Sequence, residues 1–341
     1  ESSLSEYENG KREPRFSQLN QLAGVYHRSI AFFFEEGEIP SEVVLWRKRP
    51  DDALLAADIE GQFLLLCRQY HNLEVWCGDR RPPILPEAQG DASSFGYDAA
   101  AALANEVRRD LALGDRPGSS LRTVLEEVCG VKLFYLSFEP TGTAASTVDE
   151  TFGPAVLLNA KNVPWRRNFD LAHELFHLLT WKVFRTPGQK DGVVASEREE
   201  QLATCFASRL LMPTDPLELA INDVTHDDRI KLTDLCDVAR QFDVSTEALL
   251  WRLKFLRNRS EDQTREDIER CREAEALLPA RACDEPPTRP ARFEALAHKA
   301  LRLGEFATGR FAEYLGISRT DAMKLAEQES LTDEEITIPA S

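Results

Sequence analysis

The sequence has little positive charge, no long apolar run and no cysteine pair with the spacing of a zinc knuckle. Its 341 residues carry a formal net charge of −17, whereas a protein that neutralises phosphates over its whole surface is basic. The chain as a whole is therefore not built to wrap nucleic acid, although a small basic patch within it can still bind. The apolar runs are short, the one at residues 63–67 for example, and a membrane helix needs about 20 such residues, so no membrane partner is expected.

The cysteines exclude a further class. There are seven, an odd number, and no two are separated by two residues, which argues against a disulfide framework. Unpaired thiols are typical of a reducing compartment, so we expect a cytoplasmic location.

The pattern of apolar and turn-forming residues predicts mostly helices and a small sheet, an α+β fold. Residues 131–138 and 154–160 are short, apolar and partly β-branched, which is typical of strands, and residues 139–153 between them are expected to form a loop or ragged edge. We expect three parts: residues 1–50, a helix-turn-helix remnant with a linker; residues 51–258, the main domain; and residues 259–341, a linker followed by a C-terminal helical domain.

The strongest chemical signal is HELFH at residues 173–177. Residues four apart lie on one face of a helix, so His173 and His177 can direct two imidazoles to one metal ion, while Glu174 can reach a water bound to it. The alternative is a core helix whose histidines are satisfied. The apolar flanks predict burial, and buried ionisable groups need a reason, which favours the metal site. Asn168 or Asp170 is expected to cap this helix.

A catalytic zinc site needs a third protein ligand and an open position. Residues 196–213 form the candidate helix for it and offer Glu197, Glu199 and Glu200. Spacing alone does not distinguish Glu199 from Glu200.

The segments RRNFDLAHELFHLL and EEQLATCFASRLLMP resemble the conserved blocks of the ImmA/IrrE family of zinc metallopeptidases. The resemblance spans residues from about 53 to 256. It implies a zincin-like fold, Zn²⁺ as the cofactor, and Glu200 as the third ligand beside the two histidines. Thr204 stands where that family usually has Asn or Asp, a position that can support the metal ligands.

The metal chemistry follows from this set of residues. Zinc lowers the pKa of its bound water to about 7 and polarises the scissile carbonyl, and Glu174 takes the proton as general base. A group must also stabilise the oxyanion, and the sequence leaves that role open. Arg166 and Arg167 precede the motif, but they can equally be structural.

Cys77 precedes a glycine in a proline-rich loop. A thiolate is a good zinc ligand, so this cysteine is a candidate latch that closes the open position of the metal. The simpler interpretation is an ordinary, partly buried cysteine.

The first residues are similar to the end of an Xre-type helix-turn-helix domain, on the pattern of Ser5, Tyr7, Glu8, Gly10 and Pro14. The resemblance implies that Lys11 and Arg12 contact phosphates and that Ser2, Ser3 and Ser5 lie near the groove. The first two helices of such a domain do not precede this stretch. We expect either that a segment before residue 1 is missing or that the protein has lost the DNA-binding helices and kept the helix that closes this domain.

Two further stretches also resemble helix-turn-helix motifs. Residues 235–256 lack a basic face and are expected to form a structural hairpin. Residues 304–328 carry a glycine turn and a serine cap, and they are expected to dimerise the chain, sense a ligand or bind DNA.

The family resemblance implies a zinc endopeptidase that regulates transcription by cutting a helix-turn-helix repressor at one site after stress or DNA damage. The partners expected are this protein substrate, DNA through the N-terminal part, and a second copy of the chain. The alternative is a non-catalytic DNA-binding regulator with a structural or ligand-sensing zinc site. An intact Glu174 argues against that alternative, because a structural site has no use for it.

Overall fold

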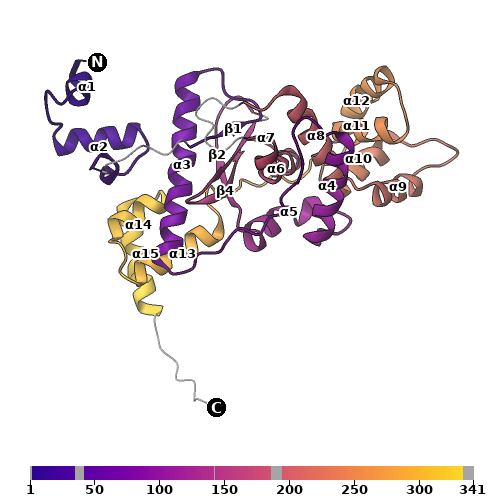
Figure 1. The fold of residues 1–341 in the computed structure, drawn as a ribbon. Helices are drawn as coiled ribbons and strands as arrows, with labels where there is room; N and C mark the ends of the chain where they lie inside the picture. The colour runs from indigo at the N-terminus through magenta and orange to yellow at the C-terminus, as the bar shows by residue number, and fades with distance from the viewer. Residues whose placement is uncertain (1, 35–41, 142, 186–193, 333–341) are drawn as a thin grey trace, which may run out of the picture.

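The computed structural model describes residues 2–34, 42–141, 143–185 and 194–332. Helices predominate within these residues and surround a small sheet, so the predicted α+β class is confirmed (Figure 1). The strands are β1 (Leu45–Trp46), β2 (Lys132–Leu136), β3 (Ala144–Asp149) and β4 (Gly153–Asn159). The helices are α1 (Ser2–Glu8), α2 (Phe16–Val25), η1 (Ile30–Phe34), α3 (Ala53–Trp76), α4 (Tyr97–Asp110), η2 (Pro117–Ser119), α5 (Leu121–Thr123), η3 (Val124–Val128), α6 (Pro164–Leu179), α7 (Trp181–Phe184), α8 (Glu197–Leu211), α9 (Thr214–Asp223), α10 (Leu232–Gln241), α11 (Thr246–Leu256), α12 (Glu261–Glu275), α13 (Ala291–Arg302), α14 (Thr308–Leu315) and α15 (Arg319–Thr332).

The sheet is mixed, with the strand order β1-β3-β4-β2. Strand β2 is parallel to β4, and β3 is antiparallel to both β1 and β4. The strands predicted at residues 131–138 and 154–160 are present as β2 and β4, but the loop predicted between them is wrong, because it contains β3. Ala144, Ala145 and Ser146 have little intrinsic preference for a strand. They form one because β3 is buried between two partners.

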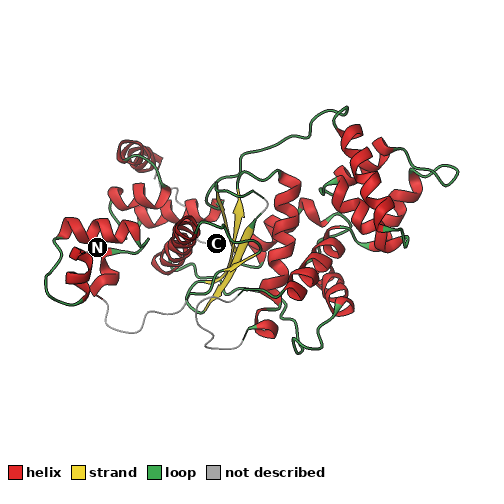
Figure 2. Ribbon diagram, turned by 90° about the horizontal axis from the view of Figure 1, so that it is seen from above, coloured by secondary structure: helices red, strands yellow, loops and turns green. Residues whose placement is uncertain are grey.

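The sheet separates two hydrophobic cores. Side chains alternate across a strand, so Leu133 and Tyr135 face one core while Phe134 faces the other. The site-side core also contains side chains of α4, α6, α8, α10, α11 and α12. The far-side core contains side chains of α3, α13 and α14. Seen from above, the strands lie between two groups of helices (Figure 2).

Helix α12 occupies the first half of the stretch that was expected to be a linker. Thr264, Ile268 and Cys271 are buried, and the helix packs against α10 and α11. Charged residues dominate its other faces, which is why its sequence resembles a linker. Helices α10 and α11 themselves bury Leu235, Val238 and other apolar residues in the site-side core, as expected of a structural hairpin.

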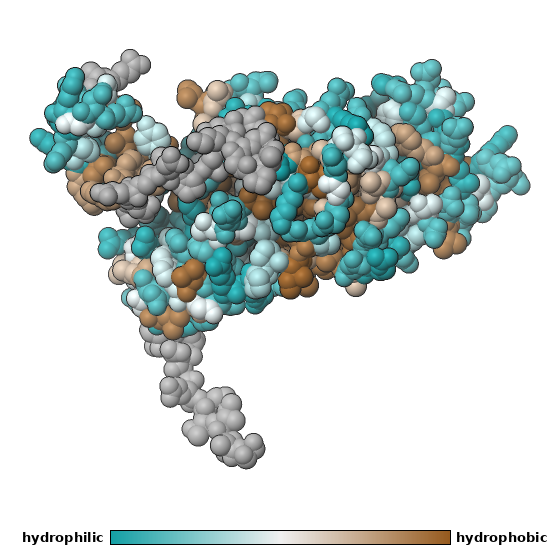
Figure 3. Space-filling model, in the orientation of Figure 1, coloured by the Kyte–Doolittle hydropathy of each residue, from teal (hydrophilic) through white to brown (hydrophobic). Residues whose placement is uncertain are grey.

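The surface agrees with the composition. On the face drawn in Figure 3, hydrophilic residues predominate and apolar patches interrupt them. Among the described residues, no helix is both long enough and apolar enough to span a bilayer.

Candidate metal centre

Helix α6 carries the HELFH motif and begins earlier than predicted. It covers Pro164–Leu179, with Val163 as its N-cap residue, because proline at the first position already has the backbone angle of a helix. The prediction that Asn168 or Asp170 caps this helix is therefore wrong. Asp170 lies inside the helix, is fully buried, and forms an ion pair with Arg47, which follows strand β1.

Two helices bring three ligand-type side chains together. Helix α6 packs against α8, and this contact places His173, His177 and Glu200 in one cluster. The Nε2 atoms of the two histidines are 3.3 Å apart. Glu200 Oε2 is 3.1 Å from His173 Nε2, and Glu200 Oε1 is 3.3 Å from His177 Nε2.

These distances fit a tetrahedral metal. Zinc binds histidine nitrogen at roughly 2.0–2.1 Å, so two of its tetrahedral ligands lie about 3.3–3.4 Å apart. The two imidazoles face each other at this spacing with their Nε2 atoms, and a carboxylate closes the third corner. Two histidines and one glutamate are a donor set typical of catalytic zinc. The residues present therefore fit the metal that the sequence predicts.

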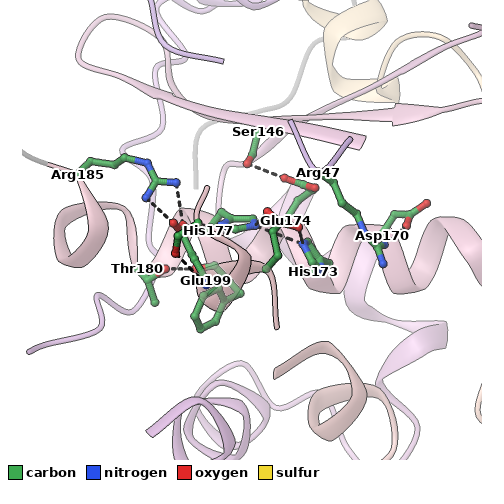
Figure 4. A network of polar contacts seen from close by, with 12 residues as sticks. Arg47, Ser146, Asp170, His173, Glu174, His177, Thr180, Arg185 and Glu199 are labelled. Carbon is green, nitrogen blue, oxygen red and sulfur yellow. Dashed lines mark hydrogen bonds and ion pairs between the residues drawn. The ribbon is translucent and has the colours of Figure 1, made fainter. Parts of the chain in front are cut away.

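Glu199 lies behind the cluster and is not part of it. Its Oε1 atom is 2.9 Å from His177 Nδ1, on the ring nitrogen that faces away from His173. Arg185 donates two hydrogen bonds to the same carboxylate, at 2.7 and 3.1 Å (Figure 4). A carboxylate on the distal nitrogen fixes the orientation and tautomer of a metal-binding histidine. The structure thus gives the adjacent residues Glu199 and Glu200 different positions, which spacing alone did not.

Glu174 is fully buried beside the cluster. Ser146, on β3, donates a hydrogen bond of 2.7 Å to Glu174 Oε2, and Figure 4 shows these two side chains pointing toward each other. The other oxygen, Oε1, is buried and has no hydrogen-bond partner among the described residues. A buried carboxylate oxygen without a donor is costly, so this atom can accept a further hydrogen bond.

Burial and hydrogen bonding together set the pKa values of the cluster. Desolvation lowers the pKa of His173 to about 3, so this imidazole is neutral, as a metal ligand must be. Desolvation also acts to lower the pKa of His177, but hydrogen bonds to Glu199 and Glu200 outweigh it and raise this pKa to about 9. Burial raises the pKa of Glu174 to about 7. A general base with this pKa can both accept and release a proton near neutrality.

The other residues considered for this site lie elsewhere or serve the scaffold. The structure does not bring Cys77 to the cluster: its thiol is buried in the far-side core and donates a hydrogen bond to the carbonyl of Leu296. Arg167 is buried and donates to the carbonyl of Asn162 at 2.8 Å. Thr204 is exposed, one helical turn after the glutamate ligand.

The residues predicted to contact DNA lie in the N-terminal part. Ser3 and Ser5 are exposed on α1, and Lys11 and Arg12 are exposed in the turn that follows it. Helices α1 and α2 agree with the helix, turn and helix expected here. DNA contact by these residues stays a prediction.

Three residues beside the cluster carry no usable sequence signal. Arg47, Ser146 and Arg185 stand in segments without a motif, and they approach Asp170, Glu174 and Glu199, respectively. Only Glu199 could have been found, because a carboxylate next to a predicted ligand is a natural partner for the distal nitrogen of a histidine.

Comparison with known proteins agrees with this geometry in part. Residues 126–254 match the family Peptidase_M78, described as the IrrE N-terminal-like domain. The matched range includes the three candidate ligands and Glu174. No curated protein was found to be similar to the chain. A solved structure of a Mycobacterium tuberculosis transcriptional regulator is 16% identical with a TM-score of 0.33, and the match covers 55% of this chain and 51% of that one. The chain thus spans about half the length of that protein.

Proposed function

We propose that this chain is a zinc-dependent endopeptidase that regulates transcription by cutting a protein substrate. The match of residues 126–254 to a peptidase family supports this proposal. The observation that carries it is the position of Glu174, which is buried beside the ligand cluster with one carboxylate oxygen unpartnered among the described residues. A purely structural metal site gains nothing from such a group.

Each residue of the cluster and its surroundings has a separate role in the proposed reaction. His173, His177 and Glu200 would hold the metal, and zinc, when bound, supplies a Lewis acid that activates water and polarises the peptide carbonyl. Glu174 Oε1 accepts the proton of the attacking water and delivers it to the leaving amine. Ser146 keeps this carboxylate oriented through Oε2. Glu199 and Arg185 keep the ring of His177 in place.

The substrate proposed is a helix-turn-helix repressor, cut at one site after stress or DNA damage. The resemblance of the two motif blocks to ImmA/IrrE metallopeptidases supports this class. A repressor encoded beside this chain is the first substrate to test. The exposed Lys11 and Arg12 would bring the chain to DNA if the N-terminal part binds there.

The decisive variant is Glu174→Gln. It keeps the size of the side chain but removes the base, so cleavage of the repressor should fall by about 10²–10⁴-fold. Zinc content, measured by elemental analysis, should stay the same because the three ligands are intact. The matched control is Glu106→Gln, an exposed glutamate on α4, which should cleave at the parent rate.

Cleavage at the parent rate by Glu174→Gln would exclude the proposed base. If the parent protein binds zinc but leaves the repressor intact under every activating condition, the alternative of a non-catalytic regulator is favoured. Less than about half an equivalent of zinc in protein purified without chelator would exclude the metal site itself.

A further inference from the structure

A groove with a volume of about 800 Å³ runs between α8 and α11. Its α8 side extends from Glu197 to Arg209, and its α11 side from Ala248 to Phe255. Twelve residues of helix separate Glu197 from Arg209, a length of about 18 Å. An extended peptide covers this distance with about five residues.

The groove opens onto the candidate metal centre. Glu200, whose carboxylate approaches both histidines, also forms part of the groove wall. A polypeptide whose cleaved bond lies at the cluster therefore has its neighbouring residues beside this groove. The groove and the cluster thus adjoin at Glu200, which belongs to both.

The walls of the groove are apolar. Phe169, Trp251 and Phe255 contribute aromatic rings, and Phe255 is 71% exposed. Burial raises the pKa of the Cys205 thiol, so this side chain is neutral and acts as a small apolar surface. A pocket of this size lined by aromatic residues is typical of a ligand site.

Small side chains make room between these rings. Cys205 and Ser208 on α8, and Ala248 on α11, stand where larger residues would fill the space. The end nearest the cluster carries Glu197, while Arg209 stands at the other end. Acidic residues of a substrate are therefore disfavoured next to the cleaved bond.

We propose that this groove binds the part of the protein substrate next to the cleaved bond, and that it selects segments with at least two large apolar side chains. The inference rests on the proposed function and adds the substrate class to it. One bulky side chain does not fill about 800 Å³. A segment of a protein substrate that carries several apolar side chains on one face can fill this volume.

The test is to fill the groove without touching the metal ligands. Ser208→Phe places a ring in the groove, and Ser208 lies eight residues after Glu200, about 12 Å along the helix. The matched control is Thr233→Phe, which adds the same ring at an exposed position near the start of α10, away from the groove. Zinc content and thermal unfolding show whether both variants keep the fold.

Two quenched fluorescent peptides serve as probes, identical except that three central residues are Leu-Phe-Leu in one and Ser-Gln-Ser in the other. The parent protein should cleave the apolar peptide with a kcat/KM at least tenfold higher, since one extra apolar contact typically changes this ratio about 10–200-fold. Ser208→Phe should lower kcat/KM for the apolar peptide by at least about tenfold. Thr233→Phe should leave it unchanged.

A binding measurement separates this inference from the proposed function. The labelled Leu-Phe-Leu peptide is titrated against zinc-loaded Glu174→Gln protein, with and without Ser208→Phe, and followed by fluorescence anisotropy. If the peptide binds Glu174→Gln, if Ser208→Phe abolishes this binding, and if the parent protein does not cleave the peptide, the groove proposal is supported and the peptidase proposal is rejected. Cleavage that Ser208→Phe leaves unchanged, or equal rates on both peptides, overturns the groove proposal while the peptidase stands. Absence of both binding and cleavage overturns both.

Discussion

Two buried glutamates, Glu74 and Glu174, lie on opposite sides of the sheet and differ in how they are compensated. Glu74 is 4% exposed in the far-side core, and each of its carboxylate oxygens has a cationic partner. Arg292 lies 2.6 Å from Oε1 and Lys132 lies 3.1 Å from Oε2. Glu174 is equally buried, but among the described residues the hydroxyl of Ser146 is the single hydrogen-bond partner of its carboxylate.

This difference in partners distinguishes Glu74, which stabilises the fold, from Glu174, which we propose to be the general base. Burying a charge is expensive unless it is paired and hydrogen-bonded, and the network around Glu74 meets this condition. It joins α3, β2 and α13, so it fastens the C-terminal helices to the sheet. Within the described part of the chain, one oxygen of Glu174 has no hydrogen-bond partner, which is the position that the proposed general base requires.

The largest effect should come from breaking the compensated network. Glu74→Gln removes the anion that Lys132 and Arg292 share, and breaking one partner of a buried ion pair costs about 3–5 kcal/mol. The free energy of unfolding, measured by urea denaturation, should fall by this amount with or without zinc. The same change at Glu174 should cost less, because burial raises the pKa of Glu174 to about 7 and its nearby cations, His177 and Arg47, keep other carboxylate partners. A loss at Glu174 equal to that at Glu74 would contradict the distinction between them.

An exposed ion pair provides the control for this comparison. Glu261 is paired with Arg265 on the surface of α12, where solvent screens the charges. Glu261→Gln should change the urea midpoint far less than Glu74→Gln.

A smaller effect is expected at Glu199, which supports the metal centre without belonging to it. Glu199→Gln can still accept from the distal nitrogen of His177, but it loses its charge and its ion pair with Arg185. Removing such a support typically weakens metal binding 10–100-fold, or about 1.4–2.7 kcal/mol. Competition with a zinc-binding dye measures the change. Glu106→Gln should bind zinc like the parent, and an unchanged affinity in Glu199→Gln would show that this carboxylate does not orient the ring.

The smallest effect on stability is expected at Glu126 on η3. This carboxylate is partly buried, and the charge of Arg122 does not fully compensate its burial. Burial outweighs the attraction of Arg122 and raises its pKa from 4.5 to about 7. For an acid whose folded pKa is raised, the contribution to stability is fully present below the unfolded pKa and is lost as the pH rises through the folded value. The parent protein should therefore lose more stability between pH 4.5 and about 7 than Glu126→Gln does. Glu106→Gln, at an exposed position on α4, should keep the parent's pH dependence.

Several elements could be predicted because local sequence determines them. The strands β2 and β4 carry runs of apolar and β-branched residues, and helix α8 ends at Leu211, immediately before Met212-Pro213. The motif at residues 173–177 specifies two imidazoles on one helical face, whatever surrounds that helix. Strand β3 was missed because its first residues favour no state strongly, and helix α12 was missed because its charged faces resemble a linker. Their structure comes from packing between neighbours.

The sequence by itself determined the candidate groups of the centre: the two histidines of α6, the proposed base between them and a short list of acidic candidates on one further helix. Spacing alone did not separate Glu199 from Glu200, and the family resemblance favoured Glu200. The tertiary structure gives the two carboxylates different positions, because the packing of α6 on α8 turns one to the Nε2 atoms and the other to Nδ1 of His177. It also brought Ser146 to Glu174 and placed Cys77 in the far-side core. These outcomes depend on contacts between residues far apart in the chain, and the spacing of a local motif carries no information about them.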